Sequence, residues 1–226
     1  RLPDGRTLGW AEYGDPQGRP VLYFHGGLSS RLDSRFSHQA CLSHGIRLIA
    51  PDRPGIGLSD YQPRRRLTDW PADAACLLDA LGIEKASVLG WSGGGPYVLA
   101  CAQAMPERIY KAATVAGMAP LDAPRSAREL GMAADRLLFP MAQTAPWLAE
   151  AVLQVSAYGS RRAQYRGLQK TVRAPADRRV VDRMSLIDAT DTFREALRAG
   201  ARGAVQDYRV TGGRWDLDLA RIKLPV

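Results

Sequence analysis

The chain has 226 residues, enough for one large domain or for one core with an inserted subdomain, and 46% of its residues are hydrophobic. No run of about 18 apolar residues is present, so we expect no membrane span and no membrane partner. The net charge of +8 raises the question of nucleic-acid binding. The basic residues are mixed with acidic ones, however, and the run of three arginines at 64–66 has no aromatic interleaving, which argues against a nucleic-acid partner.

The three cysteines, Cys41, Cys76 and Cys101, are odd in number and lie within apolar, helix-like runs. This pattern predicts reduced thiols in a protein core and favours a cytoplasmic location. No signal-peptide pattern is visible at the N-terminus. The chain begins with Arg1 inside a segment that already looks structured, so we expect that the N-terminus is clipped and that a leader could have been removed.

Short apolar runs alternate with longer helix-like runs through the first half of the chain. The predicted strands cover residues 7–13, 20–24, 46–50, 86–89 and 112–115, and the predicted helices cover residues 31–44, 67–81 and 96–104. This alternation predicts βαβ units and an α/β fold with a doubly wound, mostly parallel sheet. Ligands of such sheets bind at the carboxyl ends of the strands, where Gly26, Asp52 and Ser92 lie.

The pattern changes after residue 118. Between residues 119 and 204 no strand is predicted, and helix-like stretches follow one another at 126–138, 146–155, 161–172, 177–186 and 191–199. We therefore predict an all-helical cap inserted into an α/β core. The first part of the core would span residues 1–118, the cap residues 119–204, and residues 205–226 would return to the core without completing it. Residues 222–226 are expected to enter another strand of the sheet.

The most informative stretch is Gly-Trp-Ser-Gly-Gly-Gly at residues 90–95, between a predicted strand and a predicted helix. A serine at the apex of such a turn is the pattern of a nucleophile elbow. The turn is so tight that the residues two before and two after Ser92 must be small, and here they are Gly90 and Gly94. The helix that begins there offers unpaired N–H groups to a developing oxyanion. The same glycines also suit a structural turn or a phosphate cradle, although no Gly-Lys-Ser/Thr follows.

Four features occur in a fixed order along the chain. They are His-Gly-Gly at 25–27, Asp-Arg-Pro-Gly-Ile-Gly-Leu-Ser at 52–59, the turn around Ser92 and the late helical insertion. Together they resemble the α/β-hydrolase fold superfamily, in particular bacterial members with a helical cap. The resemblance implies a serine hydrolase in which Ser92 attacks an ester, amide or similar acyl carbon of a small-molecule substrate through an acyl-serine intermediate. It implies no cofactor, and it leaves the substrate and the oligomeric state open.

The resemblance also assigns the oxyanion hole. One donor is the backbone N–H of Gly93, the residue after the nucleophile. The second donor comes from the loop after His25, at Gly27 or at Leu28, because this chain lacks the proline that many relatives carry there. In the family pattern His25 shapes this loop and is not the general base.

His38, Cys41 and His44 are spaced three residues apart in a predicted helix. Three ligands on consecutive turns of one helix fan out too far to close a tetrahedral site, and no fourth candidate is near in sequence. Packing in the core and at the surface explains these residues better, so we expect no metal site.

A catalytic serine needs a histidine to accept its proton and a carboxylate to orient that histidine. In the family the acid follows the strand that this chain only begins at Val226, and the histidine follows a still later strand. A minority of members place the acid one strand earlier, where Asp122 is the candidate. All three histidines precede Ser92, so we predict a fragment of a serine hydrolase that is itself inactive. The alternatives are a non-catalytic, ligand-binding pseudo-hydrolase and an acyltransferase or perhydrolase on the same fold.

Overall fold

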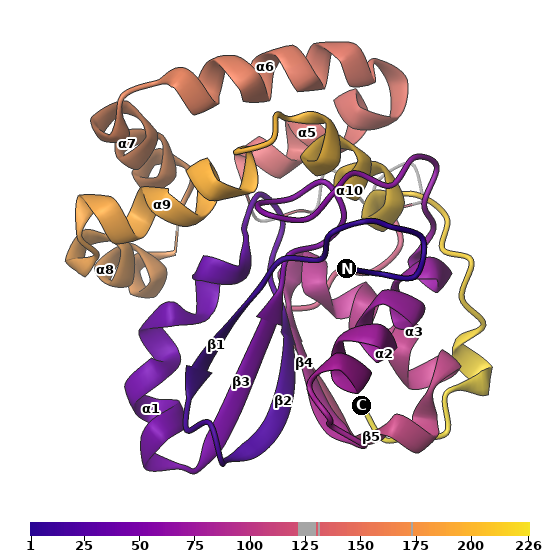
Figure 1. Cartoon of the computed structure of the whole chain (residues 1–226). Helices are drawn as coiled ribbons and strands as arrows, with labels where there is room; N and C mark the ends of the chain where they lie inside the picture. Colours follow the sequence, from indigo (N-terminus) through magenta and orange to yellow (C-terminus); the bar gives the residue numbers. More distant parts are fainter. Residues whose placement is uncertain (122–129, 131, 173) are drawn as a thin grey trace.

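The computed structural model describes residues 1–121, 130, 132–172 and 174–226 (Figure 1). Five strands form one sheet in the spatial order β1-β3-β2-β4-β5. They are β1 (Trp10–Gly14), β2 (Arg19–Phe24), β3 (Ile46–Pro51), β4 (Ala86–Trp91) and β5 (Ile109–Val115). In this sheet β1 runs antiparallel to β3, whereas the pairs β2–β3, β2–β4 and β4–β5 are parallel. The predicted α/β class with a mostly parallel sheet is confirmed.

Helices cover both faces of the sheet. They are α1 (His38–Ser43), which continues a 3-10 turn at Arg31–Ser37, α2 (Trp70–Ala80) and α3 (Gly95–Ala104). Alternate side chains of a strand point to opposite faces, so Tyr23 packs with Cys41 of α1 while Phe24 joins the core under α2 and α3. In that core the Trp70 ring packs edge-on against two other rings. Its centroid is 5.5 Å from that of Phe24 and 5.8 Å from that of Tyr97.

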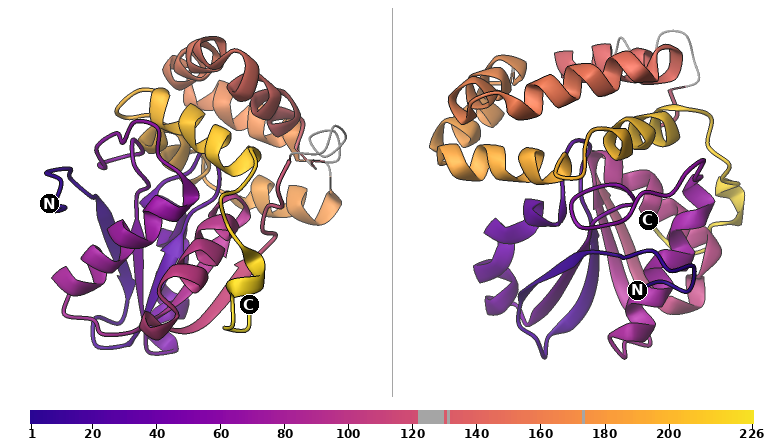
Figure 2. Two further views of the ribbon diagram at one scale, coloured as in Figure 1. Left: turned by 90° about the vertical axis from the view of Figure 1, so that its right-hand side faces the viewer. Right: turned by 45° about the horizontal axis from the view of Figure 1, so that its top comes forward.

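A layer of helices lies across the carboxyl ends of the parallel strands (Figures 1 and 2). It consists of α5 (Ala133–Thr144), α6 (Pro146–Tyr158), α7 (Arg161–Thr171), α8 (Pro175–Arg183), α9 (Leu186–Ala196) and α10 (Arg202–Gly212). Its own apolar core includes Phe139, Leu153 and Tyr208. The described part of residues 119–204 contains no strand. None of the helices in the described residues is both long enough and apolar enough to span a bilayer.

The last helix, α10, belongs to both layers. The boundary predicted between residues 204 and 205 falls inside it. Val205 packs with the apolar core of the helical layer, together with Ile56 of the loop after β3. Val210, further along α10, packs against the core of the sheet, and Asp207 pairs with the buried Arg53. The division into core and cap therefore stays a prediction, with α10 in contact with both parts.

Some helix limits differ from the sequence-based expectation. α5 covers Ala133–Thr144, whereas the pattern indicated 126–138, of which residues 126–129 lie outside the described chain. α9 begins at Leu186, five residues earlier than expected, because the Ser185 hydroxyl caps its N-terminus and accepts a hydrogen bond from the Asp188 N–H at 3.0 Å. α10 was not predicted at all.

The strand expected at residues 222–226 is not formed. After a 3-10 turn at Leu219–Arg221 the chain has no regular structure and runs along the outside of α3. The Asp218 N–H donates to the Gln103 side chain of α3 at 2.8 Å, and Leu224 packs against the core under α2 and α3. The prediction was wrong because an apolar run can be buried against a helix as well as within a sheet.

Gly203 brings α10 into contact with the loop after β3. A methyl group at Gly203 would overlap the carbonyl of Gly55, and Gly55 itself has a φ of 79° that disfavours other residues. We expect Gly203→Ala to destabilise the protein by about 2 kcal/mol, because the steric overlap with backbone exceeds the gain in helix propensity. Gly167→Ala in α7 is the control, since no described atom other than the adjoining backbone of its own helix lies within 4 Å of the added methyl group. Urea unfolding of both variants measures the difference, and equal stability would contradict the close packing.

Candidate active site

Ser92 occupies the sharp turn between β4 and α3. The backbone is extended at Trp91, with φ −108° and ψ 134°, and then turns into the left-handed region at Ser92, with φ 50°. A 3-10 turn at Ser92–Gly94 leads directly into α3. The left-handed conformation costs a residue other than glycine about 1–3 kcal/mol, and such strain concentrates at functional positions.

The glycines around Ser92 are needed for steric reasons. A methyl group at Gly90 would lie 2.5 Å from the carbonyl oxygen of Gly94. A methyl group at Gly94 would overlap the carbonyl oxygen of Phe24 at the end of β2. The turn therefore packs against the backbone of the neighbouring strand and has no room for larger residues at these two positions.

The two residues predicted as oxyanion donors lie side by side. The Gly27 nitrogen is 3.0 Å from the position that a Cβ atom on Gly93 would take. This proximity follows from the parallel pairing of β2 with β4, in which Phe24 lies opposite Gly90. Gly27 is exposed, and within the described chain its N–H donates no hydrogen bond to the backbone or to a side chain. Its N–H is therefore available to a ligand next to Ser92.

His25 is fully buried and both of its ring nitrogens are occupied by backbone groups. Nδ1 donates to the Gly26 carbonyl at 2.9 Å, and Nε2 accepts from the Arg53 N–H at 3.4 Å. Burial lowers the pKa of His25 well below its ordinary value, and the Arg53 cation lowers it further. A neutral histidine with both nitrogens engaged holds the loop in shape and does not reach Ser92.

The other two histidines also bind backbone groups elsewhere. His38 Nδ1 accepts from the Gly14 N–H at 3.0 Å, at the end of β1. His44 is exposed, and its Nδ1 lies 2.8 Å from the Ala40 carbonyl at the end of α1. Neither histidine has a hydrogen bond with Ser92. Asp122, the alternative acid, lies outside the described residues, and among the described residues no cluster of three His, Cys, Asp or Glu side chains is arranged for a metal.

A buried charge network next to the loop after β2 was not predicted from the sequence. Its centre is Asp207 of α10, whose carboxylate accepts hydrogen bonds from Arg53, Arg65 and Tyr97. The side chains of Arg53 and Arg65 are 1% and 2% exposed, although both arginines belong to polar loops in the sequence. No local signal marked these residues, because α10 itself is a mixed sequence of polar, small and apolar residues.

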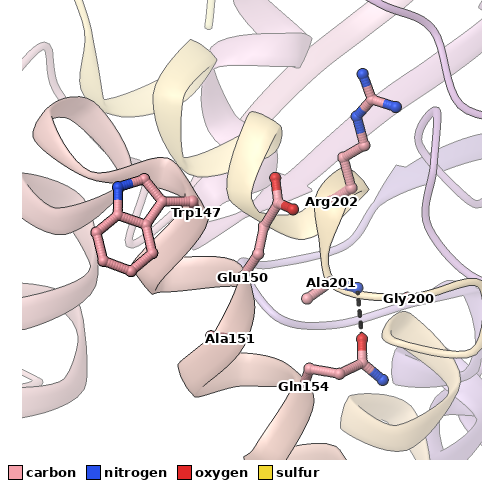
Figure 3. Close-up of a pocket in the computed structure, with 7 residues that line it drawn as sticks. All are labelled: Trp147, Glu150, Ala151, Gln154, Gly200, Ala201 and Arg202. Carbon is pink, nitrogen blue, oxygen red and sulfur yellow. Dashed lines mark hydrogen bonds between the residues drawn. The ribbon is translucent and has the colours of Figure 1, made fainter.

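Two surface hollows lie beside α10, and neither is lined by Ser92. The larger, of about 430 Å³, separates α6 from the start of α10 (Figure 3). Gln154 is one of the residues that line it, and its side chain accepts a hydrogen bond from the Ala201 N–H at 3.2 Å. The smaller, of about 260 Å³, lies between Tyr61 and the start of α10 and shares Arg202 with the first. Both hollows are separate from the turn that carries the serine.

Three features are now established: a mostly parallel sheet, a serine with left-handed backbone between a strand and a helix, and a glycine loop beside that serine. Together they define an α/β-hydrolase type of protein. The sequence matches the alpha/beta hydrolase fold family over residues 19–158, a segment that includes Gly27 and Ser92. The chain belongs to this family.

The curated relatives match about half of the chain. A non-heme chloroperoxidase from Streptomyces lividans is 37% identical over 120 residues, which make up 52% of this chain and 44% of that protein. A proline iminopeptidase from Neisseria gonorrhoeae is 35% identical over 107 residues, or 44% of this chain and 33% of that protein. The matched segments thus span less than half of the length of these relatives.

Solved structures resemble the chain over almost its whole length. A hydrolase from Pseudomonas aeruginosa has a TM-score of 0.68 at 23% identity and covers 99% of this chain and 76% of its own. Epoxide hydrolase A from Mycobacterium thermoresistibile has a TM-score of 0.64 at 23% identity, with 92% and 72% covered. This likeness concerns the fold, and the different reactions named for these proteins select none of them for this chain.

Proposed function

We propose that the protein is a serine hydrolase in which Ser92 attacks the acyl carbon of a small ester, amide or related substrate and forms an acyl-serine intermediate. The observation that carries the proposal is the left-handed backbone of Ser92, which presents its side chain at the apex of the turn. The strain is maintained by glycines that permit no larger residue, as expected for a position with a function beyond the fold.

In this proposal the N–H groups of Gly93 and Gly27 stabilise the oxyanion. Gly93 starts the helical turn, where N–H groups lack partners and the helix dipole is positive. Gly27 is favoured over Leu28 because its nitrogen lies 3.0 Å from the position of a Cβ atom on Gly93 and because Gly27 is the more exposed of the two residues. Removal of one such donor typically lowers kcat by about 100- to 1000-fold, so the pair would be a major part of catalysis.

The proposed mechanism also requires a general base for Ser92. A serine hydroxyl is a weak nucleophile until a neighbouring base accepts its proton. His25, His38 and His44 are each engaged with backbone groups and have no hydrogen bond with Ser92. We therefore propose that none of these three is the base. The second candidate function is a ligand-binding pseudo-hydrolase in which Ser92 is not activated.

Labelling with a fluorophosphonate tests the nucleophile. We expect the modified residue, identified by mass spectrometry, to be Ser92, and Ser92→Ala to remove all labelling without loss of the fold. Ser43→Ala, which changes an exposed serine of α1, is the control and should label at the unchanged rate. Modification of a different serine in the Ser92→Ala variant, at the rate of the unchanged protein, would contradict the assignment.

The pH dependence of the same labelling tests the base. Without a histidine at Ser92, hydroxide must remove the proton, so the rate should rise about tenfold per pH unit between about pH 7 and 9. With a histidine base the labelling rate would instead reach a plateau above the pKa of the histidine, which is ordinarily about 6.5. A plateau in the 226-residue chain would show that one of its three histidines reaches Ser92 and would overturn our exclusion of them.

A further inference from the structure

The guanidinium of Arg53 holds the loop that follows β2. Its Nη1 donates to the His25 carbonyl at 2.5 Å, and its Nη2 donates to the Gly26 carbonyl at 2.9 Å. The Gly26 carbonyl accepts a second hydrogen bond from His25 Nδ1, also at 2.9 Å. Arg53 follows β3 in the sequence, so it ties together the loops at the ends of two adjacent strands.

Fixing the Gly26 carbonyl also fixes the N–H of Gly27. The two groups belong to one planar peptide unit, so the carbonyl cannot turn without the N–H. A cation bound to the carbonyl also polarises the unit and makes its N–H a stronger donor. Arg53 and His25 thus orient the peptide that carries the proposed second oxyanion donor, although neither touches Ser92.

Asp207 determines where the Arg53 guanidinium lies. Its carboxylate accepts from Arg53 Nε at 3.0 Å and from Nη2 at 2.7 Å, while other N–H groups of the same planar fork face the two loop carbonyls. Arg65 Nη2 and the Tyr97 hydroxyl each donate to Asp207 at 2.6 Å and hold it in place. Although burial opposes ionisation, Arg53 and Arg65 keep the pKa of Asp207 well below its ordinary range.

The next residue of α10 reaches the same loop directly. The Tyr208 hydroxyl is 3.5 Å from the position that a Cβ atom on Gly27 would take, and it donates to Asp135 of α5 at 2.8 Å. Two consecutive residues of α10 therefore lie at the Gly27 loop: Asp207 acts on it through Arg53, and the Tyr208 hydroxyl lies beside Gly27. The position in which α10 packs therefore affects the geometry of the loop after β2.

We propose that Asp207 is a positioning residue for the oxyanion site: from α10 it holds Arg53 on the carbonyls of His25 and Gly26 and so fixes the Gly27 N–H beside Ser92. The proposal rests on the oxyanion role of Gly27 proposed above. If Asp207 has this role, the oxyanion site is complete only when α10 is packed against the loop after β2.

The test needs a variant that removes the carboxylate without leaving excess buried charge. Asp207→Asn alone leaves two buried arginines without a counter-ion, which could unfold the protein. The double variant Asp207→Asn/Arg65→Met keeps the net charge of the network unchanged while Arg53 loses its anchor. Arg65→Met alone, which leaves the pairing of Asp207 with Arg53, is the first control. Asp73→Asn is the second, because it breaks a part-buried pair with Arg6, and neither residue shares a hydrogen bond with the Asp207 network.

Two measurements separate this inference from the proposed function. NMR relaxation reports the order of the Gly27 amide without any chemistry, and fluorophosphonate labelling reports the reactivity of Ser92. In the double variant we expect the Gly27 order parameter to fall from about 0.85 to below about 0.6. We expect the labelling rate to fall by about tenfold or more. Asp73→Asn should leave both quantities unchanged, and Arg65→Met, which keeps the pairing of Asp207 with Arg53, should change both less than the double variant does.

An ordered Gly27 amide in the folded double variant would overturn the positioning role of Asp207, whatever the labelling rate. If Gly27 becomes mobile while the labelling rate is unchanged, Asp207 does position the loop. The same result would overturn the role of Gly27 as an oxyanion donor. If Ser92 of the unchanged protein is not labelled at all, the proposed nucleophile fails. The Gly27 relaxation data still decide whether Asp207 positions the loop.

Discussion

Gly94→Ala is expected to destabilise the protein by about 3 kcal/mol and to abolish the labelling of Ser92. The added methyl group would overlap the Phe24 carbonyl oxygen and lie 2.9 Å from the His25 carbonyl oxygen. Both oxygens are backbone atoms that cannot move independently, because Phe24 pairs with β4 and the His25 carbonyl is bound by Arg53. The turn must therefore move away from β2, and Ser92 moves with it.

Urea unfolding and fluorophosphonate labelling check this expectation together. Gly167→Ala supplies the control, since it adds the same methyl group at a position of α7 where no described atom is close. It should be neutral or slightly stabilising and leave the labelling unchanged. A Gly94→Ala protein that keeps both its stability and its labelling would show that the turn is not packed as described.

Alkaline pH is expected to unfold the protein steeply. Burial raises the pKa of Tyr23, Tyr97 and Tyr208, and a neighbouring carboxylate raises each of them further. The folded state therefore favours the neutral phenols. Their contribution to stability is complete below the unfolded-state pKa of about 10 and is lost as the pH rises from there towards the folded-state values. Each tyrosine costs about 1.4 kcal/mol per pH unit in that window, or about 4 kcal/mol for the three together.

Tyrosinate absorbance and circular dichroism, followed together above about pH 10, measure this effect. The buried tyrosines should ionise only as the protein unfolds. Tyr23→Phe should lower the pH dependence of the unfolding free energy by about one proton. Tyr158→Phe, which changes a tyrosine that is 81% exposed, should leave it unchanged. Ionisation of all eight tyrosines in a protein that remains folded would contradict the burial of these three side chains.

Much of the sheet follows from local pattern. The central strands β2, β3 and β4 form at nearly their expected places, because strands covered on both faces are apolar throughout and are bounded by turns. The turn at Ser92 is equally local. Gly90 and Gly94 are required by the backbone path itself, so their spacing around the serine is visible before any tertiary contact is known.

The sequence by itself therefore determined the α/β class, the order of the strands along the chain and the position of the candidate nucleophile. The tertiary structure alone decided where α10 packs and which buried charges pair beside the loop after β2. Arg53, Arg65 and Asp207 are polar residues far apart in the sequence, and each by itself is typical of a solvated surface. Only the fold brings them together, where mutual pairing makes the burial of all three charges tolerable.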